Sequence, residues 1–498
     1  MKKQKRRTLA CTALLTSVLL LLSSCGLIII RHGDETTASP AGTETPETTE
    51  TPETVPKYPD GVNPVPDSRS FEKAQAYVQA LPDRSLGDIP FIIACTDADH
   101  LNPSVENEEE ASFVDVALLR RNKLIREKYG ISILAVTSDE ETIFQNFLKS
   151  VYSGDYYADL MELPQTALGK YANTSKLFNL NSLPFIDLSA PYFYQDAVDQ
   201  ASAGNCTYGA AGAGNLSPES VYCMFFNKDA DGIDAAALYK KAYAGTWTWE
   251  TFFTVAKDTA DSPDENASQA LRLVLDANAD RNLLLLASSG EHLLKTSFRS
   301  YPTASDDLTG LEALIETARA VFAGSSSAED PIAPLKDNTT VFCIAQADKI
   351  ETLADESLNW GILPIPKNSE KQTSYPAVSS NQTVFAAIPT MSSAENTGLI
   401  LQAYQAASYG HIADAYLKHA LRDCVRDSDS IGMLELAFTS GLFYDFGYMF
   451  CDAYDSVRRA SVEAYEAALG TGGAYADYYR MAEANLKYWN PINFPGLN

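Results

Sequence analysis

The sequence is short of the residues on which metal and redox chemistry depend. Its 498 residues include five His and eight Cys, and no two Cys are spaced as C-x-x-C. A His-rich metal site and a zinc or dithiol motif are therefore not supported, and no metal or cofactor is predicted. The strings H-E-x-x-H, G-x-S-x-G and G-x-x-x-x-G-K-[ST] are missing too, which removes common signatures of metallopeptidases, serine hydrolases and phosphate-binding loops.

Basic residues are also scarce relative to acidic ones. The chain has 38 Lys and Arg against 65 Asp and Glu, so its formal net charge is −27. Such a surface repels phosphate backbones, which argues against a nucleic-acid partner. The apolar share of 45% and the charged share of 21% are those of an ordinary globular protein. The length allows two or three domains, or one large two-lobed body.

The first 24 residues have the pattern of an export signal. Five bases lie within residues 2–7, and a mostly apolar segment follows at 9–22. That segment is shorter than the about 20 residues that a membrane-spanning helix needs. The string LSSCG at 22–26 resembles the lipobox of bacterial lipoproteins, which implies cleavage after residue 24 and a lipid on the thiol of Cys25. An uncleaved anchor is the alternative, because apolar residues at 27–30 prolong the hydrophobic run.

Residues 25–66 are predicted to form a lipid anchor and a disordered linker. They are rich in Thr, Glu and Pro, and the hexad TETPET occurs twice in succession, at 43–48 and 49–54. Such a segment cannot bury enough apolar surface to offset its ordering entropy. About forty extended residues reach roughly 120 Å, so this segment suits a spacer between a lipid anchor and a globular body.

From residue 67 onward the pattern is that of an α/β fold. Apolar runs at 91–95, 131–136 and 158–163 have the length of buried parallel strands. One amphipathic helix is predicted from 113 to a left-handed cap at Gly130, and another from a Ser138–Glu141 capping box to about 152. The alternation of strands and helices indicates a parallel sheet.

The middle of the chain is mixed and its last hundred residues are mostly helical. Helices are predicted to begin at Thr248 and Thr309, and Trp247 and Trp249 are predicted to be core anchors. Further strands are predicted at 221–226, 341–345, 359–363 and 384–388.

Two pairs of cysteines are interpreted differently. Cys95 and Cys343 fall inside strand-like runs and are predicted to be small buried residues. Cys206 and Cys223 could form a disulfide in an oxidising exterior, and the sequence leaves that pairing open.

Several strings along this body resemble the extracellular solute-binding proteins of bacterial ABC importers, of the maltose-binding, sugar-binding type. The strings are RNKLIREKYGI at 121–131, SGD at 153–155 before ADLM at 158–161, FFNK at 225–228 before GTWTWE at 245–250, WGILPIP at 360–366, and RDSD at 426–429 before Met433 and Leu434. The specific feature is their order over residues 90–440, behind a lipobox.

The resemblance implies an α/β, two-lobed periplasmic-binding-protein-like fold of type II, with hinge crossings and a helical C-terminal region. Lobe 1 would comprise 67–206 and 376–425, and lobe 2 would comprise 207–375 and 426–498. The implied function is that of a monomeric, non-enzymatic receptor, lipid-anchored to the cell membrane and facing the extracytoplasmic side. It would close on a small polar solute, a carbohydrate first and a peptide second, and deliver it to ABC transporter permease subunits.

Ligand-binding residues are expected where strands end at the cleft, since open α/β sheets bind ligands beyond the carboxyl ends of their strands. The candidates are Thr96 and Asp97 after the first strand, Glu162 and Gln165 at the third, Gln346 after the strand at 341–345, and Tyr375, Ser379 and Ser380 on the returning segment. The resemblance adds Tyr208 in an inter-lobe crossing and Trp489 as a stacking aromatic near the C-terminus. The alternative for each is a solvated loop residue or a packed core aromatic.

Two other functions remain open on the sequence alone. A tethered surface adhesin or interaction protein would share the signal and the linker, but would bind no small soluble ligand. A glycoside hydrolase would use an acid pair such as Asp97 and Glu162, and would turn over a glycan.

Replacing Cys25 by Ser tests the predicted lipid anchor. Serine cannot form the thioether, so we expect Cys25→Ser to lose the acyl mass and to leave the lipid-modified membrane fraction. Mass spectrometry of the N-terminal peptide is decisive, because an uncleaved signal helix would hold the variant at the membrane without any lipid. An acyl-free wild-type protein with unchanged detergent partition would contradict the anchor.

Overall fold

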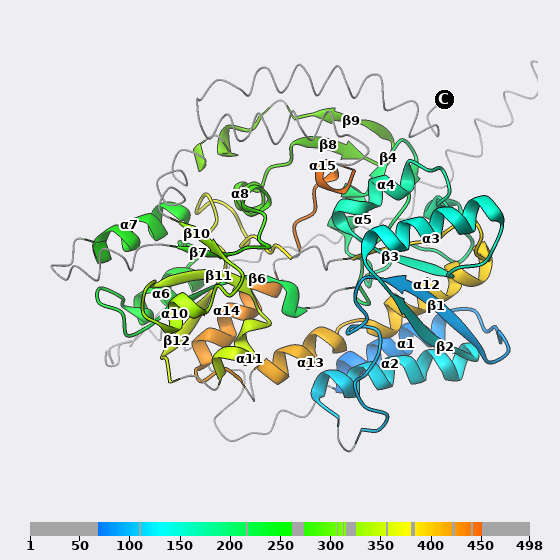
Figure 1. Cartoon of the computed structure of the whole chain (residues 1–498), viewed down its shortest axis with the longest axis horizontal. Helices are drawn as coiled ribbons and strands as arrows, with labels where there is room; N and C mark the ends of the chain where they lie inside the picture. Colours follow the sequence, from blue (N-terminus) through cyan, green and yellow to red (C-terminus); the bar gives the residue numbers. More distant parts are fainter. Residues whose placement is uncertain are drawn as a thin grey trace, which may run out of the picture. The chain divides into compact units, whose positions relative to one another are not determined.

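A computed structural model describes residues 68–450, apart from 109–110, 216–217, 261–272, 306, 312, 315–324, 355–356, 380–383, 421–423 and 440–441. The predicted signal segment, Cys25, the linker, Ser380 and Trp489 lie outside the described residues. All the described residues belong to one compact unit, which contains two main sheets with helices around each (Figure 1). Within them, no helix combines the length and the apolar character that a membrane crossing requires.

The first sheet has four strands in the order β13-β3-β1-β2. They are β1 (Ile89–Cys95), β2 (Ile131–Thr137), β3 (Leu160–Pro164) and β13 (Val384–Ala387). β1 pairs in parallel with both β2 and β3, whereas β13 runs antiparallel to β3. The predicted parallel sheet is therefore confirmed, and a strand from far along the chain is added at its edge.

Helices cover both faces of this sheet (Figure 1). They are α1 (Ser68–Ala80), α2 (Phe113–Tyr129) and α12 (Ala394–Ser408) on one face and α3 (Glu140–Ser153) on the other. Successive residues of a strand point to opposite faces. Ile93 accordingly packs in the cluster that contains residues of α2 and α12, whereas Ala94 packs with Ile143 and Phe147 of α3. Burial on both faces explains why β1 is a continuous apolar run.

The helix ends follow the sequence closely. Gly130 ends α2 in the left-handed conformation, with φ of 66°, as predicted. The predicted cap of α3 is wrong by one residue: the N-cap is Asp139, whose carboxylate accepts from the backbone N–H of Thr142. Asp and Ser cap helices about equally well, so the sequence alone does not tell which of two adjacent residues is the N-cap. In the structure it is Asp139 rather than Ser138.

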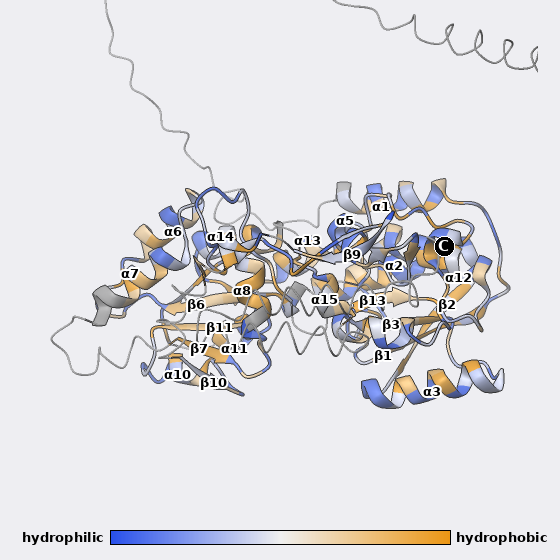
Figure 2. Ribbon diagram, turned by 90° about the horizontal axis from the view of Figure 1, so that it is seen from above, coloured by the Kyte–Doolittle hydropathy of each residue, from blue (hydrophilic) through white to orange (hydrophobic). Residues whose placement is uncertain are grey.

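The second sheet has five strands in the order β10-β7-β11-β6-β12. They are β6 (Tyr222–Asn227), β7 (Val274–Asp276), β10 (Ser326–Ala328), β11 (Phe342–Gln346) and β12 (Trp360–Leu363). β6 runs antiparallel to both of its neighbours, and all six of its residues are buried. Figure 2 colours β6 and β11 as hydrophobic, whereas α3 alternates between hydrophobic and hydrophilic residues.

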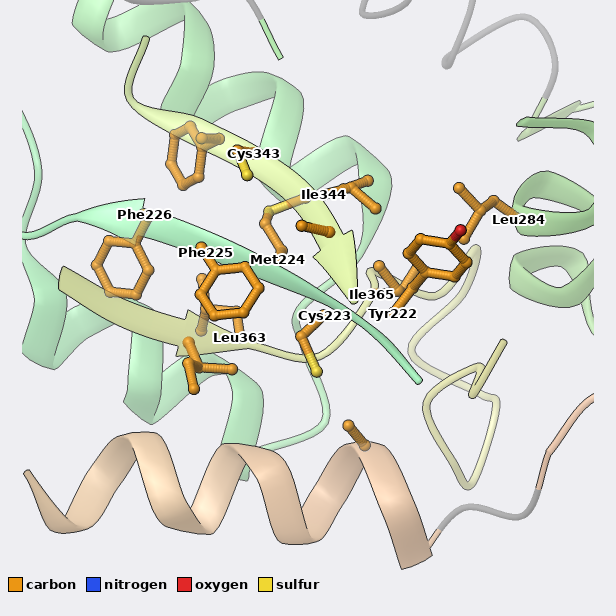
Figure 3. Packing of buried hydrophobic residues seen from close by; sticks show 14 of the residues in the cluster. Tyr222, Cys223, Met224, Phe225, Phe226, Leu284, Cys343, Ile344, Leu363 and Ile365 are labelled. Carbon is orange, nitrogen blue, oxygen red and sulfur yellow. The ribbon is translucent and has the colours of Figure 1, made fainter. Parts of the chain in front are cut away.

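One hydrophobic core surrounds the second sheet. Figure 3 shows side chains of β6, β11 and β12 in this core together with Leu284. The helices that contribute buried residues are α6 (Ala235–Tyr243), α7 (Trp249–Ala260), α8 (Arg281–Ser289), α11 (Lys349–Ala354) and α14 (Ser428–Thr439). Trp247 and Trp249 are 0% and 1% exposed, which confirms them as core anchors.

A hairpin from the middle of the chain packs with the first sheet. Its strands are β8 (Leu294–Ser297) and β9 (Ser300–Ala304), and it lies against α5 (Gln195–Gln200) and β4 (Ser202–Ala203). The N–H of Gly204 donates to the carbonyl of Ser300, and Leu294 joins the core of β3 and β13. The remaining elements are β5 (Cys206–Thr207), α4 (Leu168–Ala172), α10 (Ala333–Lys336), and the 3-10 turns η1 (Gln165–Ala167), η2 (Leu180–Ser182) and η3 (Pro218–Ser220).

The segment 442–450, with α15 (Phe446–Met449), also packs on the first-sheet core. The division drawn from the sequence placed both this segment and the hairpin in lobe 2. Their apolar residues nevertheless share a cluster with Phe385 of β13 and Leu168 of α4. A hydrophobic pattern tells that a residue is buried but not which core buries it.

The helix α13 (His411–His419) contacts the cores of both sheets. Ile412 packs against α2, whereas the hydroxyl of Tyr416 donates to the carbonyl of Ala347, just after β11. His411 is enclosed at the first end, where burial lowers its pKa to about 4. The imidazole is therefore neutral near pH 7, which suits its apolar setting.

The cysteines are free thiols within the described residues. Cys206 lies in the core of the first sheet and Cys223 in the core of the second, so they do not pair. Cys95 and Cys343 are buried in their strands, as predicted. Burial raises the pKa of the Cys223 thiol to about 12, so it stays protonated and unreactive.

Truncating Trp247 should destabilise the second core. Its indole N–H donates to the carbonyl of Pro364 at 3.0 Å, and its ring packs edge-on against Phe252. Trp247→Phe leaves that carbonyl unpaired and a void beside it, so we expect a loss of about 2–4 kcal/mol in unfolding free energy. Urea unfolding followed by circular dichroism measures it. Phe253→Ala, on the exposed side of α7, should cost less than about 1 kcal/mol; equal losses would contradict the assignment.

Candidate functional site

A cavity of about 250 Å³ lies between elements that belong to the two cores. On one side are Asp196, Asp199 and Gln200 of α5, a helix whose Ala197 belongs to the first-sheet core. On the other side is Ala287 of α8, which belongs to the second-sheet core (Figure 1 labels both helices). The rest of the lining comes from Gly290, His292, Gln372, Ser374, Tyr375, Pro376, Ala377, Leu442, Phe443 and Tyr444.

One wall of the cavity is aromatic. The rings of His292 and Phe443 are stacked with centroids 4.9 Å apart and planes 6° from parallel. The Nδ1 atom of His292 lies 3.4 Å from a carboxylate oxygen of Asp445, which is fully buried. α8 ends at Gly290, whose φ of 73° is the left-handed turn that leads the chain to His292.

The adjoining aromatic residue, Tyr444, carries a polar group that the fold leaves unsatisfied. Its side chain is 2% exposed, and its hydroxyl has no hydrogen-bond partner in the described part of the chain. Burial raises the pKa of this phenol well above its ordinary value, and the nearby Tyr194 and Asp196 act in the same direction. The phenol is therefore protonated, and its donor and acceptor are enclosed beside the residues that line the cavity.

The segment 367–377 contributes another part of the lining, and hydrogen bonds on the side away from the cavity fix its position. The ammonium of Lys367 donates to the carbonyl of Gln372 at 2.5 Å and lies 5.2 Å from the ring centre of Tyr375. Lys367 is only 2% exposed, and burial lowers its pKa. The amide of Gln372 donates to the carbonyl of Ser288 at 3.0 Å, which ties the segment to α8.

Tyr375 contributes its ring rather than its hydroxyl. The hydroxyl donates to the carbonyl of Ala242 at 2.8 Å inside the second core, and burial raises the pKa of Tyr375 to about 12. Of the sequence-predicted ligand residues that the structure describes, Tyr375 alone lines this cavity. It was selected because it lies on the returning segment between the cores.

The other predicted residue with a clear role is Glu162, which lies inside the protein rather than at the cavity. Its side chain is fully buried. One carboxylate oxygen lies 2.7 Å from Nε2 of His100, and the other accepts from the amide of Asn215 at 2.6 Å. In this arrangement Glu162 holds protein groups together, which is not the solvent-facing position that the strand-end rule predicted.

The hydrogen bonds continue from Asn215 into α12. The side-chain oxygen of Asn215 accepts from the amide of Gln405, and Gln405 accepts in turn from the N–H of Gly214 at 2.8 Å. The hydroxyl of Tyr404 donates to the carbonyl of Gly214 at 2.5 Å. A Cβ atom at Gly214 would clash with the Tyr404 ring, so glycine is required there. We call this set, Glu162, His100, Asn215, Gln405 and Tyr404, the buried clamp.

The charge of the buried clamp is balanced from two sides. Burial by itself would lower the pKa of His100, but the charge and hydrogen bond of Glu162 raise it above its ordinary value. Asp97 acts in the same direction as Glu162, and Arg121 acts against it. Arg121 is completely buried and donates to the carbonyls of His100 and Leu101 at 2.8 and 2.5 Å.

The remaining predicted residues are scattered. Thr96 is half-buried after β1, and Asp97 accepts from the N–H of Asp99. Gln165 is buried, and its side-chain oxygen has no partner in the described part of the chain. Three further residues contact neighbours within the protein: Tyr208 is half-buried with a pKa raised by burial, Gln346 reaches the hydroxyl of Tyr222 at 3.4 Å, and Ser379 shares a hydrogen bond with Ser220 at 2.5 Å.

The residues that the sequence interpretation missed share one feature. Asp196, Asp199, His292 and Phe443 all lie outside the strand ends, on a short helix or on segments between the cores. Two regions could have been chosen from the sequence as places to look for ligand residues. They are the returning segment near 375 and the segment near 443, because both contribute to the cavity lining between the cores. No spacing within the sequence singles out these four side chains.

Comparison with known proteins defines the fold. No protein-family model matches the chain, and no curated protein matches it. The solved structure of a cyclic α-maltosyl-1,6-maltose binding protein from Arthrobacter globiformis is similar, with a TM-score of 0.52 and 13% identity over 82% of this chain and 100% of that one. A cyclo/maltodextrin-binding protein complexed with maltotetraose gives a TM-score of 0.50 and 14% identity over 81% of this chain and 97% of that one.

A third similar structure is the sugar-binding protein MalE from Xanthomonas citri, with a TM-score of 0.50 and 12% identity over 80% of this chain and 98% of that one. The chain thus has the fold of maltose-binding-type extracellular solute-binding proteins. The predicted fold class and the family resemblance are confirmed at the level of the fold.

The His100–Glu162 pair should make the stability of the first sheet depend on pH. A His whose pKa is raised on folding contributes stability below its ordinary pKa of about 6.5, and loses that contribution as pH rises through the raised value. We therefore expect His100→Asn to cost about 3–5 kcal/mol near pH 6 and less at pH 9. Thermal unfolding at both pH values measures the difference.

The matched control is His419→Asn, because His419 pairs at 2.9 Å with a largely exposed carboxylate, Glu351. It should change stability by less than about 1 kcal/mol at either pH. An equal cost of His100→Asn at pH 6 and pH 9 would contradict the charged pair.

Proposed function

We propose that the protein is an extracytoplasmic receptor that captures a small carbohydrate in the cavity between its two cores and delivers it to an ABC transporter. The observation that carries this proposal is the origin of the lining: α5 belongs to one core, α8 to the other, and two connecting segments complete the wall. A ligand in such a place contacts both cores at once. Its binding energy therefore favours the arrangement in which the cores are close.

The chemistry of the lining suits a sugar. Carboxylates accept hydrogen bonds from sugar hydroxyls, and Asp196 and Asp199 supply two carboxylates. Ser374 adds a hydroxyl that can donate or accept. The rings of His292, Phe443 and Tyr375 supply apolar faces for the C–H side of a sugar ring. The cavity volume lies just below the about 300–1,000 Å³ of typical ligand pockets.

The structures with the same fold support a carbohydrate ligand. Two of them are described as binding proteins for maltose-derived oligosaccharides and the third as a sugar-binding protein. Delivery to permease subunits follows from this class of receptor. We further propose that Cys25 carries the lipid anchor, that the linker spaces the body from the membrane, and that the protein acts as a monomer.

The predicted lobes are proposed in a modified form. Lobe 1 comprises the first sheet with 67–206 and 376–425, to which the hairpin 294–304 and the segment 442–450 are added because they share its core. Lobe 2 comprises the second sheet and its helices. The segments 207–215 and 372–375 then cross between the lobes, and α13 of lobe 1 contacts the residue after β11 of lobe 2.

The hydrolase alternative loses its acid pair. Glu162 is enclosed in the buried clamp, so it cannot act together with Asp97 on a glycan. Asp196 and Asp199 lie on one helix and thus on one wall of the cavity, whereas a glycosidase places its two carboxylates on either side of the scissile bond. A receptor that does not transform its ligand is the better interpretation.

Ligand binding should contract and stabilise the body from residue 67 onward. We expect a saturating oligosaccharide to lower the radius of gyration in small-angle scattering, and to stabilise the fold by about 2.7 kcal/mol at a hundredfold excess over Kd. Phe443→Ala removes one face of the aromatic wall, so it should weaken binding roughly tenfold or more in calorimetry. A panel of neutral and amino-substituted di- to tetrasaccharides, with peptides second, covers the ligand classes.

Phe253→Ala is the control for the variant, because Phe253 lies on the exposed face of α7 away from the cavity lining. It should bind with wild-type affinity. A rigid adhesin would show no contraction with any small solute, and a hydrolase would convert the glycan during the titration. Either result would replace the proposed function.

A further inference from the structure

We infer that the cavity selects carbohydrates that carry a free, protonated amino group over their neutral and N-acylated counterparts. This inference rests on the proposed function, because it names the ligand class of the same cavity. The ligand would be an amino sugar or an oligosaccharide of amino sugars. Its ammonium group would sit between the carboxylates of α5 and the aromatic wall.

The first argument is the charge of the lining. Asp196 and Asp199 are one helical turn apart on α5, and both line the cavity. Neither carboxylate forms an ion pair or a side-chain hydrogen bond with any residue in the described part of the chain. No Lys or Arg is among the lining residues, and the one basic side chain, His292, faces the buried carboxylate of Asp445.

The buried cation behind the returning segment forms no ion pair with these carboxylates. Lys367 is buried under the returning segment, where its ammonium is bound by the carbonyl of Gln372 and faces the Tyr375 ring. Within the described part of the chain, the cavity therefore presents two carboxylates without a compensating cation to whatever enters it. By contrast, the neighbouring acids Glu140 and Glu141 on α3 are both paired with Lys170.

The second argument is what a ligand does to these carboxylates. A ring that covers α5 removes water from both, and a carboxylate without water needs an opposite charge as well as hydrogen bonds. A neutral hydroxyl supplies only the hydrogen bond. An ammonium supplies the charge and three N–H donors on the same atom, so it can satisfy both carboxylates together.

The third argument comes from the groups across the cavity. The rings of Phe443 and Tyr375 favour a cation within about 6 Å of their faces. The Tyr444 hydroxyl is buried near Asp196 without a partner among the described residues, so this end of the lining has a polar group that the described fold leaves unsatisfied. The net charge of −27 raises the encounter rate of any cation with this surface.

The test is a matched series of tetrasaccharides on one β-1,4-linked backbone. The full chain is titrated by calorimetry at pH 6 with the glucosamine tetramer, its N-acetylated form and cellotetraose, which differ in the substituent at one ring carbon. We expect the free amine to bind at least tenfold more tightly than either of the others. Raising the salt from 50 to 500 mM should weaken the amine more than cellotetraose, because screening acts on the charged ligand.

Variants that remove a negative charge test whether the carboxylates of α5 cause the preference for the amine over cellotetraose. Asp196→Asn and Asp199→Asn should each reduce the ratio of amine to cellotetraose affinity, and the double variant should bring it below threefold. Glu127→Gln removes one negative charge from the exposed side of α2, outside the cavity, and should keep the wild-type ratio. Melting temperatures of all variants establish that the fold is intact.

The outcomes separate this inference from the proposed function. If cellotetraose or the N-acetylated tetramer binds as tightly as the free amine, the inference is wrong and the carbohydrate receptor stands. If the preference survives the double variant, the carboxylates of α5 are not its source and the inference is also wrong. If none of these tetramers and no member of the wider sugar panel binds, the proposed function fails, and the inference fails with it.

Discussion

The carboxylate of Glu162 is the buried charge on which the arrangement around the first sheet depends. A carboxylate inside a protein is tolerated only when it is paired and hydrogen-bonded. His100, from the loop after β1, supplies the opposite charge, and Asn215, from the segment between the cores, supplies the hydrogen bond. Because Gln405 of α12 then satisfies Asn215, one charge fixes four segments that are far apart in the sequence.

The buried clamp also sets the position of the cavity wall. The crossing segment that it holds bonds in turn to the start of α5: the N–H of Tyr194 donates to the carbonyl of Ala211, and the N–H of Ala213 donates to the carbonyl of Tyr192. Tyr194 is the N-cap of α5, so the start of the helix that carries Asp196 and Asp199 is bonded to the segment that the buried charge pair holds. The cavity-lining carboxylates and the structural carboxylate are thereby linked through backbone hydrogen bonds.

The sequence predicted the elements whose causes are local and missed those whose causes are distant. The sequence predicted five elements of the first sheet and its helices, because their apolar periodicity and helix caps are local features of each segment. These elements are β1, α2, β2, α3 and β3. β7 and β10 have three residues each, too few for a period to be detected. The hairpin β8–β9 owes its position to Leu294 finding the core of the first sheet, and no neighbour in sequence specifies that choice.

The candidate site shows the same division at the level of single side chains. The rule that ligands bind beyond strand ends selected Glu162 as a ligand-binding residue, but the fold buries it and supplies His100 and Asn215 as its partners. Asp196 has the same functional group on a short helix without any distinguishing pattern, and no cation among the described residues pairs with it. Whether a carboxylate builds the protein or faces a ligand is therefore decided by the charges that tertiary structure brings beside it. With 65 acids in the chain, residue type alone cannot make that distinction, whereas the partner of each acid can.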